Sequence, residues 1–82
     1  MSEKINKKVK VFSTPTCPWC NVTKEFLTAN NVEFEDVNVA SDNAAAQQMV
    51  MKSGQMGVPQ IWIDDAVIVG FNKHALEELL EL

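Results

Sequence analysis

Two cysteines separated by two residues are the strongest chemical feature of this sequence. Cys17-Pro18-Trp19-Cys20 follows a short apolar segment and precedes residues with helical spacing, so the pair lies where a strand passes into a helix. Pro18 suits the first helical position, because its fixed φ fits a helix and its missing N–H would have no partner there. Cys17 is then the residue that caps the helix, and the pair is a candidate for thiol–disulfide redox chemistry.

The start of a helix favours the thiolate form of Cys17. We expect the free amides of Trp19 and Cys20 to point toward its sulfur, and the helix dipole favours negative charge at that end. Both effects lower the pKa of the Cys17 thiol from its ordinary value of about 8.5 and make it a better nucleophile at neutral pH. Cys20, one turn later, is expected to be more shielded and to resolve the mixed disulfide that Cys17 forms. Lys24, two turns after Cys17, is a further candidate for stabilising the thiolate.

Three other roles of the cysteine pair agree less well with the sequence. A structural disulfide over so short a loop would contribute roughly 2 kcal/mol, against about 4.5 kcal/mol for a bridge spanning the whole chain. Zinc normally takes four ligands, and His74 is the only other strong donor, so we expect no metal site. Two inert buried cysteines would need neither the intervening proline nor the strand-to-helix junction. The sequence therefore favours redox catalysis without a bound cofactor.

A second motif, Gly57-Val58-Pro59, stands immediately before a predicted strand. Proline at the start of a strand cannot donate to the sheet, and an X–Pro bond in such a turn is a candidate for the rare cis form. We predict a cis bond at Pro59, which would leave the backbone N–H and C=O of Val58 free to pair with an extended peptide. A trans bond, or one far from Cys17, would make Pro59 an ordinary loop proline.

The spacing of apolar residues predicts the order strand, helix, strand, helix, strand, strand, helix. The first three elements are a strand around Val9 and Val11 that stops at Ser13, a helix over residues 18–30, and a strand over 34–39. Asp36 indicates an edge position or a bulge in this second strand. A helix capped by Ser41 or Asp42 then ends at Gly54, strands over 60–63 and 66–69 are joined by Asp64-Asp65, and Asn72 caps the last helix. The first three elements form a right-handed βαβ unit, and the hairpin adds two antiparallel strands. We expect an α/β fold with a four-stranded mixed sheet and three helices that cover both faces.

Several apolar residues are assigned to packing rather than to chemistry. The last helix is expected to turn Ala75, Leu76, Leu79 and Leu80 inward, Trp62 to pack in its strand, and Met49, Met51 and Met56 to fill the core, with a position bordering a groove as the alternative for Met56. Trp19 is different, because an exposed indole beside a cysteine is best explained by a substrate groove.

Composition limits the classes of protein that the sequence can encode. With 82 residues, of which 46% are hydrophobic and 22% charged, we expect a single folded domain over residues 1–82 and a monomer. Seven lysines and eleven acidic residues give a formal net charge of -4, which repels nucleic acid and anionic membranes. The longest apolar run, residues 66–69, is far shorter than the roughly 20 residues of a membrane span, and no apolar signal core follows the basic start. We expect a cytoplasmic protein without a nucleic-acid or membrane partner.

Over residues 9–80, the dithiol motif, Val58-Pro59 and Gly70 before the last helix have the order and spacing found in glutaredoxins, and the sequence resembles this family of the thioredoxin fold. It is most similar to the small YruB-type and NrdH-type redoxins, and residues 53–61 are especially glutaredoxin-like. The resemblance implies a thioredoxin-like sheet, a cis proline facing the dithiol, and reversible reduction of protein disulfides or glutathione mixed disulfides.

The resemblance also implies a substrate groove beside the dithiol. The contacts expected with a protein substrate, or with glutathione as a co-substrate, are Thr16, Trp19, Val58, Pro59, Gly70, Asn72 and Lys73, while Phe71 is expected to pack under the loop that presents Gly70. Glutaredoxins that bind glutathione usually carry a lysine where this chain has Thr14, and a Gly-Gly pair followed by Asp where it reads Gly70-Phe71-Asn72-Lys73. The Gly-Phe pair is closer to NrdH-type redoxins, which draw electrons from thioredoxin reductase.

The sequence thus predicts a dithiol–disulfide oxidoreductase in which Cys17 attacks and Cys20 resolves. Its partners would be disulfide-containing proteins or glutathione, together with a reductase. The alternative within the same chemistry is an NrdH-like electron donor, for example to ribonucleotide reductase, recharged by thioredoxin reductase. A third possibility is a dimer that holds an iron–sulfur cluster through Cys17 and two glutathione molecules, but Pro18 stiffens the motif and the basic residues for glutathione are incomplete.

Overall fold

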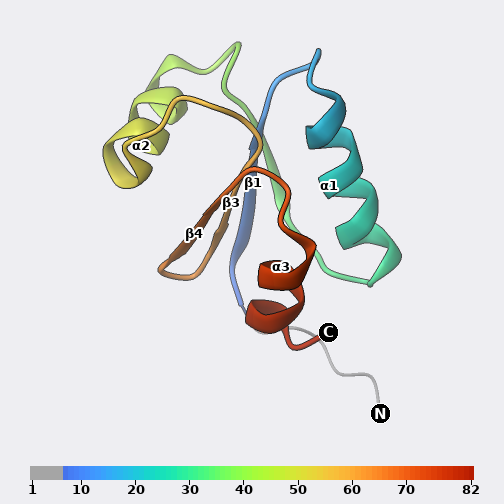
Figure 1. Cartoon of the computed structure of the whole chain (residues 1–82). Coiled ribbons are helices and arrows are strands. Elements are labelled where there is room, and N and C mark those ends of the chain that lie inside the picture. The colour runs from blue at the N-terminus through green and yellow to red at the C-terminus, as the bar shows by residue number, and fades with distance from the viewer. Residues whose placement is uncertain (1–6) are drawn as a thin grey trace.

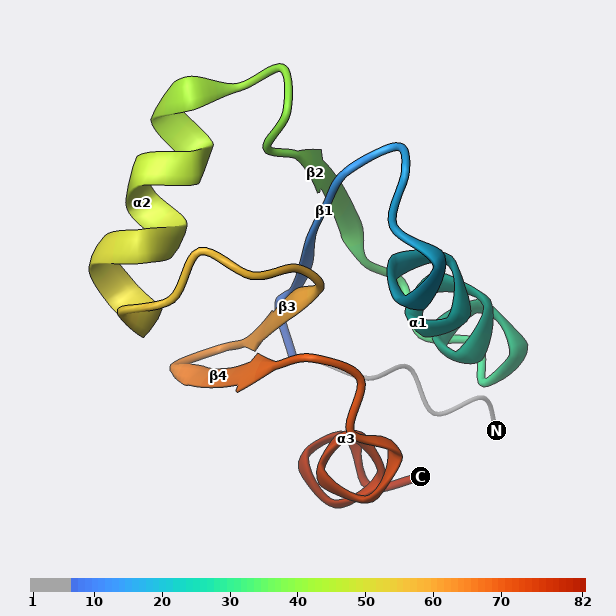
Figure 2. The same cartoon turned by 45° about the horizontal axis from the view of Figure 1, so that its top comes forward.

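The fold is a sheet between two layers of helix. In the computed structural model, which describes residues 7–82, the elements follow the predicted order: β1 (Val9–Ser13), α1 (Pro18–Ala29), β2 (Glu35–Asn38), α2 (Asn43–Ser53), β3 (Gln60–Ile63), β4 (Ala66–Val69) and α3 (Lys73–Leu80). α2 covers one face of the sheet, and α1 and α3 cover the other (Figures 1 and 2). Of the basic start over residues 4–10, residues 4–6 lie outside the described residues. Within residues 7–82, no helix is long and apolar enough to cross a membrane.

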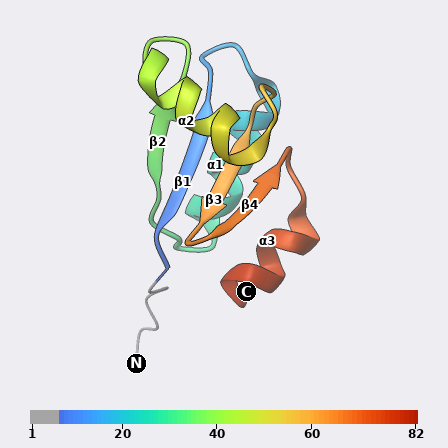
Figure 3. The same ribbon diagram turned by 90° about the vertical axis from the view of Figure 1, so that its left-hand side faces the viewer.

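The sheet combines one parallel pair of strands with two antiparallel pairs. Its order is β2-β1-β3-β4, where β1 runs parallel to β2 and antiparallel to β3, and β3 runs antiparallel to β4 (Figure 3). α1 is the crossover that the parallel pair requires. The mixed four-stranded sheet with helices on both faces confirms the predicted architecture, and β2, which contains Asp36, is an edge strand as expected.

Each face of the sheet has its own hydrophobic cluster, because side chains alternate between the two faces along a strand. The larger cluster lies against α1 and α3 and contains the fully buried residues Val11, Leu27, Ile61, Leu76 and Leu80. The smaller one lies under α2 and contains Phe12, Ala45 and Met49. Trp62 packs on this second cluster with its ring centroid 4.4 Å from that of Phe12, which confirms its predicted packing role.

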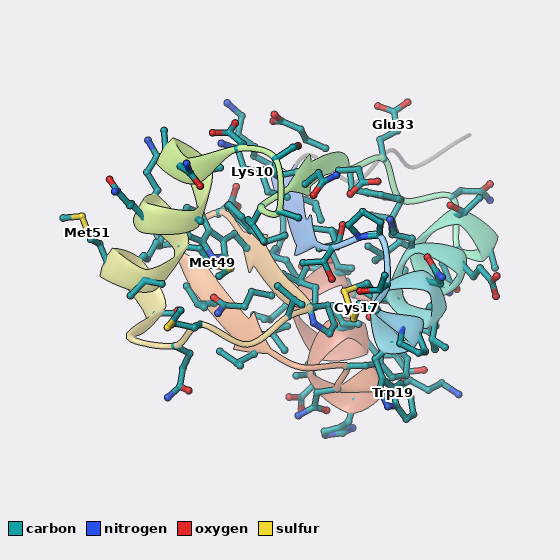
Figure 4. All side chains as sticks on the ribbon, turned by 90° about the horizontal axis from the view of Figure 1, so that it is seen from above. Lys10, Cys17, Trp19, Glu33, Met49 and Met51 are labelled. Carbon is teal, nitrogen blue, oxygen red and sulfur yellow. A yellow bond between two sulfur atoms is a disulfide. The ribbon has the colours of Figure 1, made fainter. Side chains whose placement is uncertain are left out.

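Two of the three methionines assigned to the core are on the surface. Met49 is 2% exposed, but Met51 is 85% and Met56 79% exposed. α2 turns Ala45 and Met49 toward the sheet, whereas Met51 projects from the outer side of this helix (Figure 4). Met56 follows α2 in the loop before β3. The core assignment of Met51 and Met56 was wrong because residue type alone does not determine which face of a helix, or which loop, a side chain occupies.

A glycine in the left-handed region joins β4 to α3. Gly70 has φ 85°, and its N–H donates a hydrogen bond to the carbonyl oxygen of Pro59 at 2.7 Å. Asn72 then caps α3 as predicted, since its side-chain oxygen accepts a hydrogen bond from the N–H of Ala75 at 3.1 Å. Gly70 therefore ties the beginning of α3 to the segment that precedes β3.

Replacing Leu76 by alanine should lower the free energy of unfolding by about 2–5 kcal/mol, because the fully buried side chain would leave a cavity in the larger cluster. The matched control is Met51→Ala, whose side chain is 85% exposed and whose loss should change stability by less than about 0.5 kcal/mol. Urea unfolding of the oxidised proteins measures both. Equal losses would contradict the assignment of Leu76 to the core.

Gly70→Ala should lower the free energy of unfolding by about 1–2 kcal/mol, the usual cost of a left-handed conformation in a residue with a Cβ. Gly57→Ala is the control, because no atom lies within 4 Å of an added Cβ at either position and only Gly70 has a positive φ. The control should be neutral or stabilising by up to about 1 kcal/mol. Thermal unfolding of the two variants separates them, and equal midpoints would show that the backbone at Gly70 carries no such constraint.

Candidate functional site

Three loops meet at one end of the sheet. β3 runs antiparallel to β1 and β4, and Gln60 at its beginning pairs with residues at or near the ends of both. The segment after β1 carries Cys17, the segment before β3 carries Pro59, and the segment after β4 carries Gly70. The topology of the sheet therefore brings together motifs that are far apart in the sequence.

The cysteines form a disulfide at the N-terminal end of α1. Cys17 is the N-cap residue, and its Sγ accepts a hydrogen bond from the N–H of Cys20 at 3.1 Å. Pro18 lies in the first turn, as predicted. The Trp19 amide was also expected to point to this sulfur. Among residues 7–82, however, Cys20 supplies the amide bonded to Cys17, because the third helical position is the one that the cap side chain reaches here.

The two cysteines differ in their access to solvent. Cys20 is 0% exposed and lies on the inner side of α1 with the buried Thr23 and Leu27. Cys17 is partly exposed, and Figure 4 shows it in the middle of the end where the loops meet. An incoming molecule can therefore reach Cys17 but not Cys20.

The segment before β3 faces the dithiol. Its Val58–Pro59 peptide bond is cis, as the sequence predicts. The carbonyl oxygen of Val58 lies 3.8 Å from the Sγ of Cys17. Val58 belongs to no strand, and within the described part of the chain its N–H has no backbone partner. Polar backbone groups are therefore available directly beside the sulfur of Cys17.

A groove with a volume of about 200 Å³ opens next to this segment. It is lined by Trp19, Val58, Pro59, Gly70 and Phe71, none of which is charged. Trp19 is 60% exposed, and its ring stacks on that of Phe71 with 6.0 Å between centroids and 19° between planes. The structure thus brings together four of the residues predicted to contact substrate.

Phe71 is a wall of this groove, which the sequence analysis missed by assigning it only to packing under a loop. It does pack, edge-on against Phe26 with 5.7 Å between centroids, but its other side meets Trp19 and the groove. Its position directly after Gly70 was the available signal. The sequence alone did not show that this loop reaches the two cysteines, because its position depends on the pairing of β3 with β4.

The other predicted substrate contacts do not line the groove. Thr16 is exposed in the loop before Cys17. The side-chain oxygen of Asn72 accepts a hydrogen bond from the N–H of Ala75, and Lys73 is exposed and forms no salt bridge within residues 7–82. These three residues are near the site in sequence, but none of them is among the residues that line the groove.

Lys24 does not serve the dithiol in the way the sequence predicted. Its Nζ lies 3.0 Å from a carboxylate oxygen of Asp36 on the edge strand β2, and the hydroxyl of Ser13 donates to the other oxygen at 2.8 Å. The ammonium is thus directed toward the carboxylate that a neighbouring strand provides rather than toward Cys17. This network connects α1 to β1 and β2.

Comparison with known proteins supports the family resemblance. The Glutaredoxin family model matches residues 9–68. Over 73 residues the chain is 52% identical to a protein of Clostridium pasteurianum described as an uncharacterized glutaredoxin-like 8.6 kDa protein in the rubredoxin operon, with 89% of this chain and 97% of that protein covered. It is 34% identical over 62 residues to glutaredoxin 3 of Escherichia coli strain K12, covering 76% of this chain and 75% of that protein.

The solved structures agree with the sequence comparison. The thioredoxin-like protein BC3987 superposes with a TM-score of 0.85 and 37% identity, over 89% of this chain and 100% of that chain. This likeness confirms the predicted thioredoxin-like fold. With its paired cysteines at the start of α1 and a family match over most of its length, the chain belongs to the glutaredoxin family.

Proposed function

We propose that this protein is a thiol–disulfide oxidoreductase in which Cys17 attacks the substrate and Cys20 resolves the mixed disulfide. The observation that carries the proposal is the asymmetry of the pair: Cys17 is partly exposed at the N-cap of α1, and Cys20 is fully buried behind it. A reaction that needs one accessible nucleophile and one protected partner fits this arrangement.

In the first step, the thiolate of Cys17 attacks one sulfur of a substrate disulfide. The substrate S–S bond breaks, a mixed disulfide with Cys17 forms, and the departing thiolate takes up a proton from water. The hydrogen bond from the Cys20 amide and the N-terminal end of α1 favour the thiolate form of Cys17, which is the attacking anion.

In the second step, Cys20 attacks the Sγ of Cys17 as a thiolate and displaces the second substrate thiol. The product on the protein is the Cys17–Cys20 disulfide that the structure contains. Two electrons have then passed from the protein dithiol to the substrate. An external thiol reductant, either glutathione or a flavoprotein of the thioredoxin reductase type, must return them.

The groups around Cys17 suit both a protein disulfide and a glutathione mixed disulfide. The carbonyl of Val58, 3.8 Å from the sulfur, and the N–H of the same residue offer backbone pairing to an extended peptide of either kind. The lack of charge in the groove lining favours the second candidate, an NrdH-like electron donor recharged by thioredoxin reductase. Coupling the purified protein to each reductant in turn distinguishes the two. A dithiol that must be kept reduced fits the reducing environment of the cytoplasm.

Cys17→Ser should abolish disulfide reduction, whereas Cys20→Ser should complete only the first step and accumulate the mixed disulfide. The Cys20→Ser variant keeps the attacking Cys17 but has no second thiol to resolve the mixed disulfide. Mass spectrometry of each variant after mixing with a peptide disulfide shows whether one peptide thiol is attached. Full activity of Cys17→Ser would refute the assignment of the nucleophile.

The pH at which Cys17 becomes reactive provides a second test. In the reduced Cys20→Ser variant, alkylation by iodoacetamide should reach half of its maximal rate below the ordinary thiol value of about 8.5, because the thiolate is stabilised in the fold. The same variant unfolded in guanidinium chloride is the control, since it lacks the helix. A midpoint in the folded protein equal to or above that of the unfolded protein would contradict the proposed stabilisation.

A further inference from the structure

We infer that the substrate of this dithiol is a polypeptide with an apolar side chain next to the reacting cysteine, and that Phe71 selects this side chain. The inference rests on the proposed exchange reaction at Cys17 and specifies its substrate class. It starts from the groove lined by Trp19, Val58, Pro59, Gly70 and Phe71, which is called the Phe71 groove below.

The size of the Phe71 groove suits one side chain. Its volume of about 200 Å³ is smaller than the range of about 300–1,000 Å³ typical of sites that enclose a whole small molecule. A tripeptide such as glutathione would therefore place only part of itself there. A single aliphatic or aromatic side chain could fill the groove while the rest of its polypeptide lies outside.

The chemistry of the lining favours an apolar occupant. The Phe71 groove has no charged side chain, and Trp19 exposes 60% of its surface beside it. Covering this indole with an apolar group removes hydrophobic surface from water. A carboxylate placed against the same wall would lose hydration without gaining a charged partner. Glutathione carries two carboxylates, so it gains less from this wall than an apolar peptide does.

The wall is held in place from both sides. Phe71 stacks on Trp19 at 6.0 Å and meets Phe26 edge-on at 5.7 Å. Its loop is tied down by the hydrogen bond of 2.7 Å from the Gly70 N–H to the Pro59 carbonyl oxygen. A preformed wall needs little ordering when a side chain binds, so more of the binding free energy is available for selectivity.

The position of the groove identifies which substrate residue would occupy it. Val58 lines the Phe71 groove, and its carbonyl oxygen lies 3.8 Å from the Sγ of Cys17. A substrate cysteine bonded to Cys17 must therefore place its backbone close to Val58. The residue next to that cysteine is then the one within reach of Trp19 and Phe71.

Three matched peptides test the inference. Each has one cysteine flanked on both sides by Leu, Gln or Glu and joined through a disulfide to 5-thio-2-nitrobenzoate, whose release by the reduced protein is followed in single turnovers. The second-order rate constant for the Leu peptide should exceed that for the Gln peptide by about tenfold or more, as expected from burial of one leucine side chain. The rate constant for the Glu peptide should be lower still than that for the Gln peptide, because the net charge of -4 repels its carboxylates.

Variants of the groove should remove this preference. Phe71→Ser should bring the Leu to Gln ratio within about threefold, and Phe71→Leu should restore most of it. Trp19→Ser, at a side chain that is 60% exposed, should lower the ratio in the same way and guards against loss of folding in the Phe71→Ser protein. Met51→Ser is the matched control, because Met51 is 85% exposed on the outer side of α2, and it should keep the wild-type ratio.

The outcomes separate this inference from the proposed function. If the wild-type protein attacks none of the peptides and also fails to reduce a small aliphatic disulfide, the proposed oxidoreductase activity is wrong. If it attacks the Leu and Gln peptides at equal rates, or if a folded Phe71→Ser variant keeps the wild-type ratio, the activity stands and the assignment of an apolar substrate to the Phe71 groove is overturned.

Discussion

The bond from the Cys20 amide to the sulfur of Cys17 is the interaction on which the site depends. It makes Cys17 the cap of α1 and places the sulfur where the unpaired amides of the helix begin. The same geometry sends the second cysteine into the protein, since the cap lies outside the first turn and the third helical position lies within it. The cap position thus combines a backbone donor to the sulfur of Cys17 with a difference in access between the two cysteines.

The remaining parts of the site come from the backbone. β3 lies between β1 and β4 and is antiparallel to both, so the segment before it and the segment after β4 reach the end of the sheet where α1 begins. The Gly70 to Pro59 hydrogen bond joins these two segments directly. Val58 contributes a carbonyl oxygen beside the sulfur rather than a side-chain function. The backbone of these loops therefore supplies polar groups next to the sulfur of Cys17 without polar side chains.

Charge is distributed unevenly between the surface and the site. The protein has a formal net charge of -4, yet the groove beside the dithiol is lined by uncharged residues. The Lys24–Asp36 ion pair connects α1 to the edge strand β2, and the hydroxyl of Ser13 donates a second hydrogen bond to the same carboxylate. The aromatic series Trp19, Phe71 and Phe26 joins the dithiol helix to the loop before α3. Polar contacts therefore secure one side of α1, and aromatic contacts shape the side next to the groove.

The sequence by itself determined the order of the elements, the caps at Cys17 and Asn72, and the shielding of Cys20, because each of these depends on neighbours within one or two helical turns. The tertiary structure decided which distant residues share the site. Phe71 lines the groove, Lys24 forms an ion pair with Asp36, and Met51 and Met56 are exposed to solvent. The physical reason is that strand pairing and helix orientation are set by the burial of the whole core. Local periodicity predicts where a helix or strand runs, but contacts between loops exist only after the sheet has assembled.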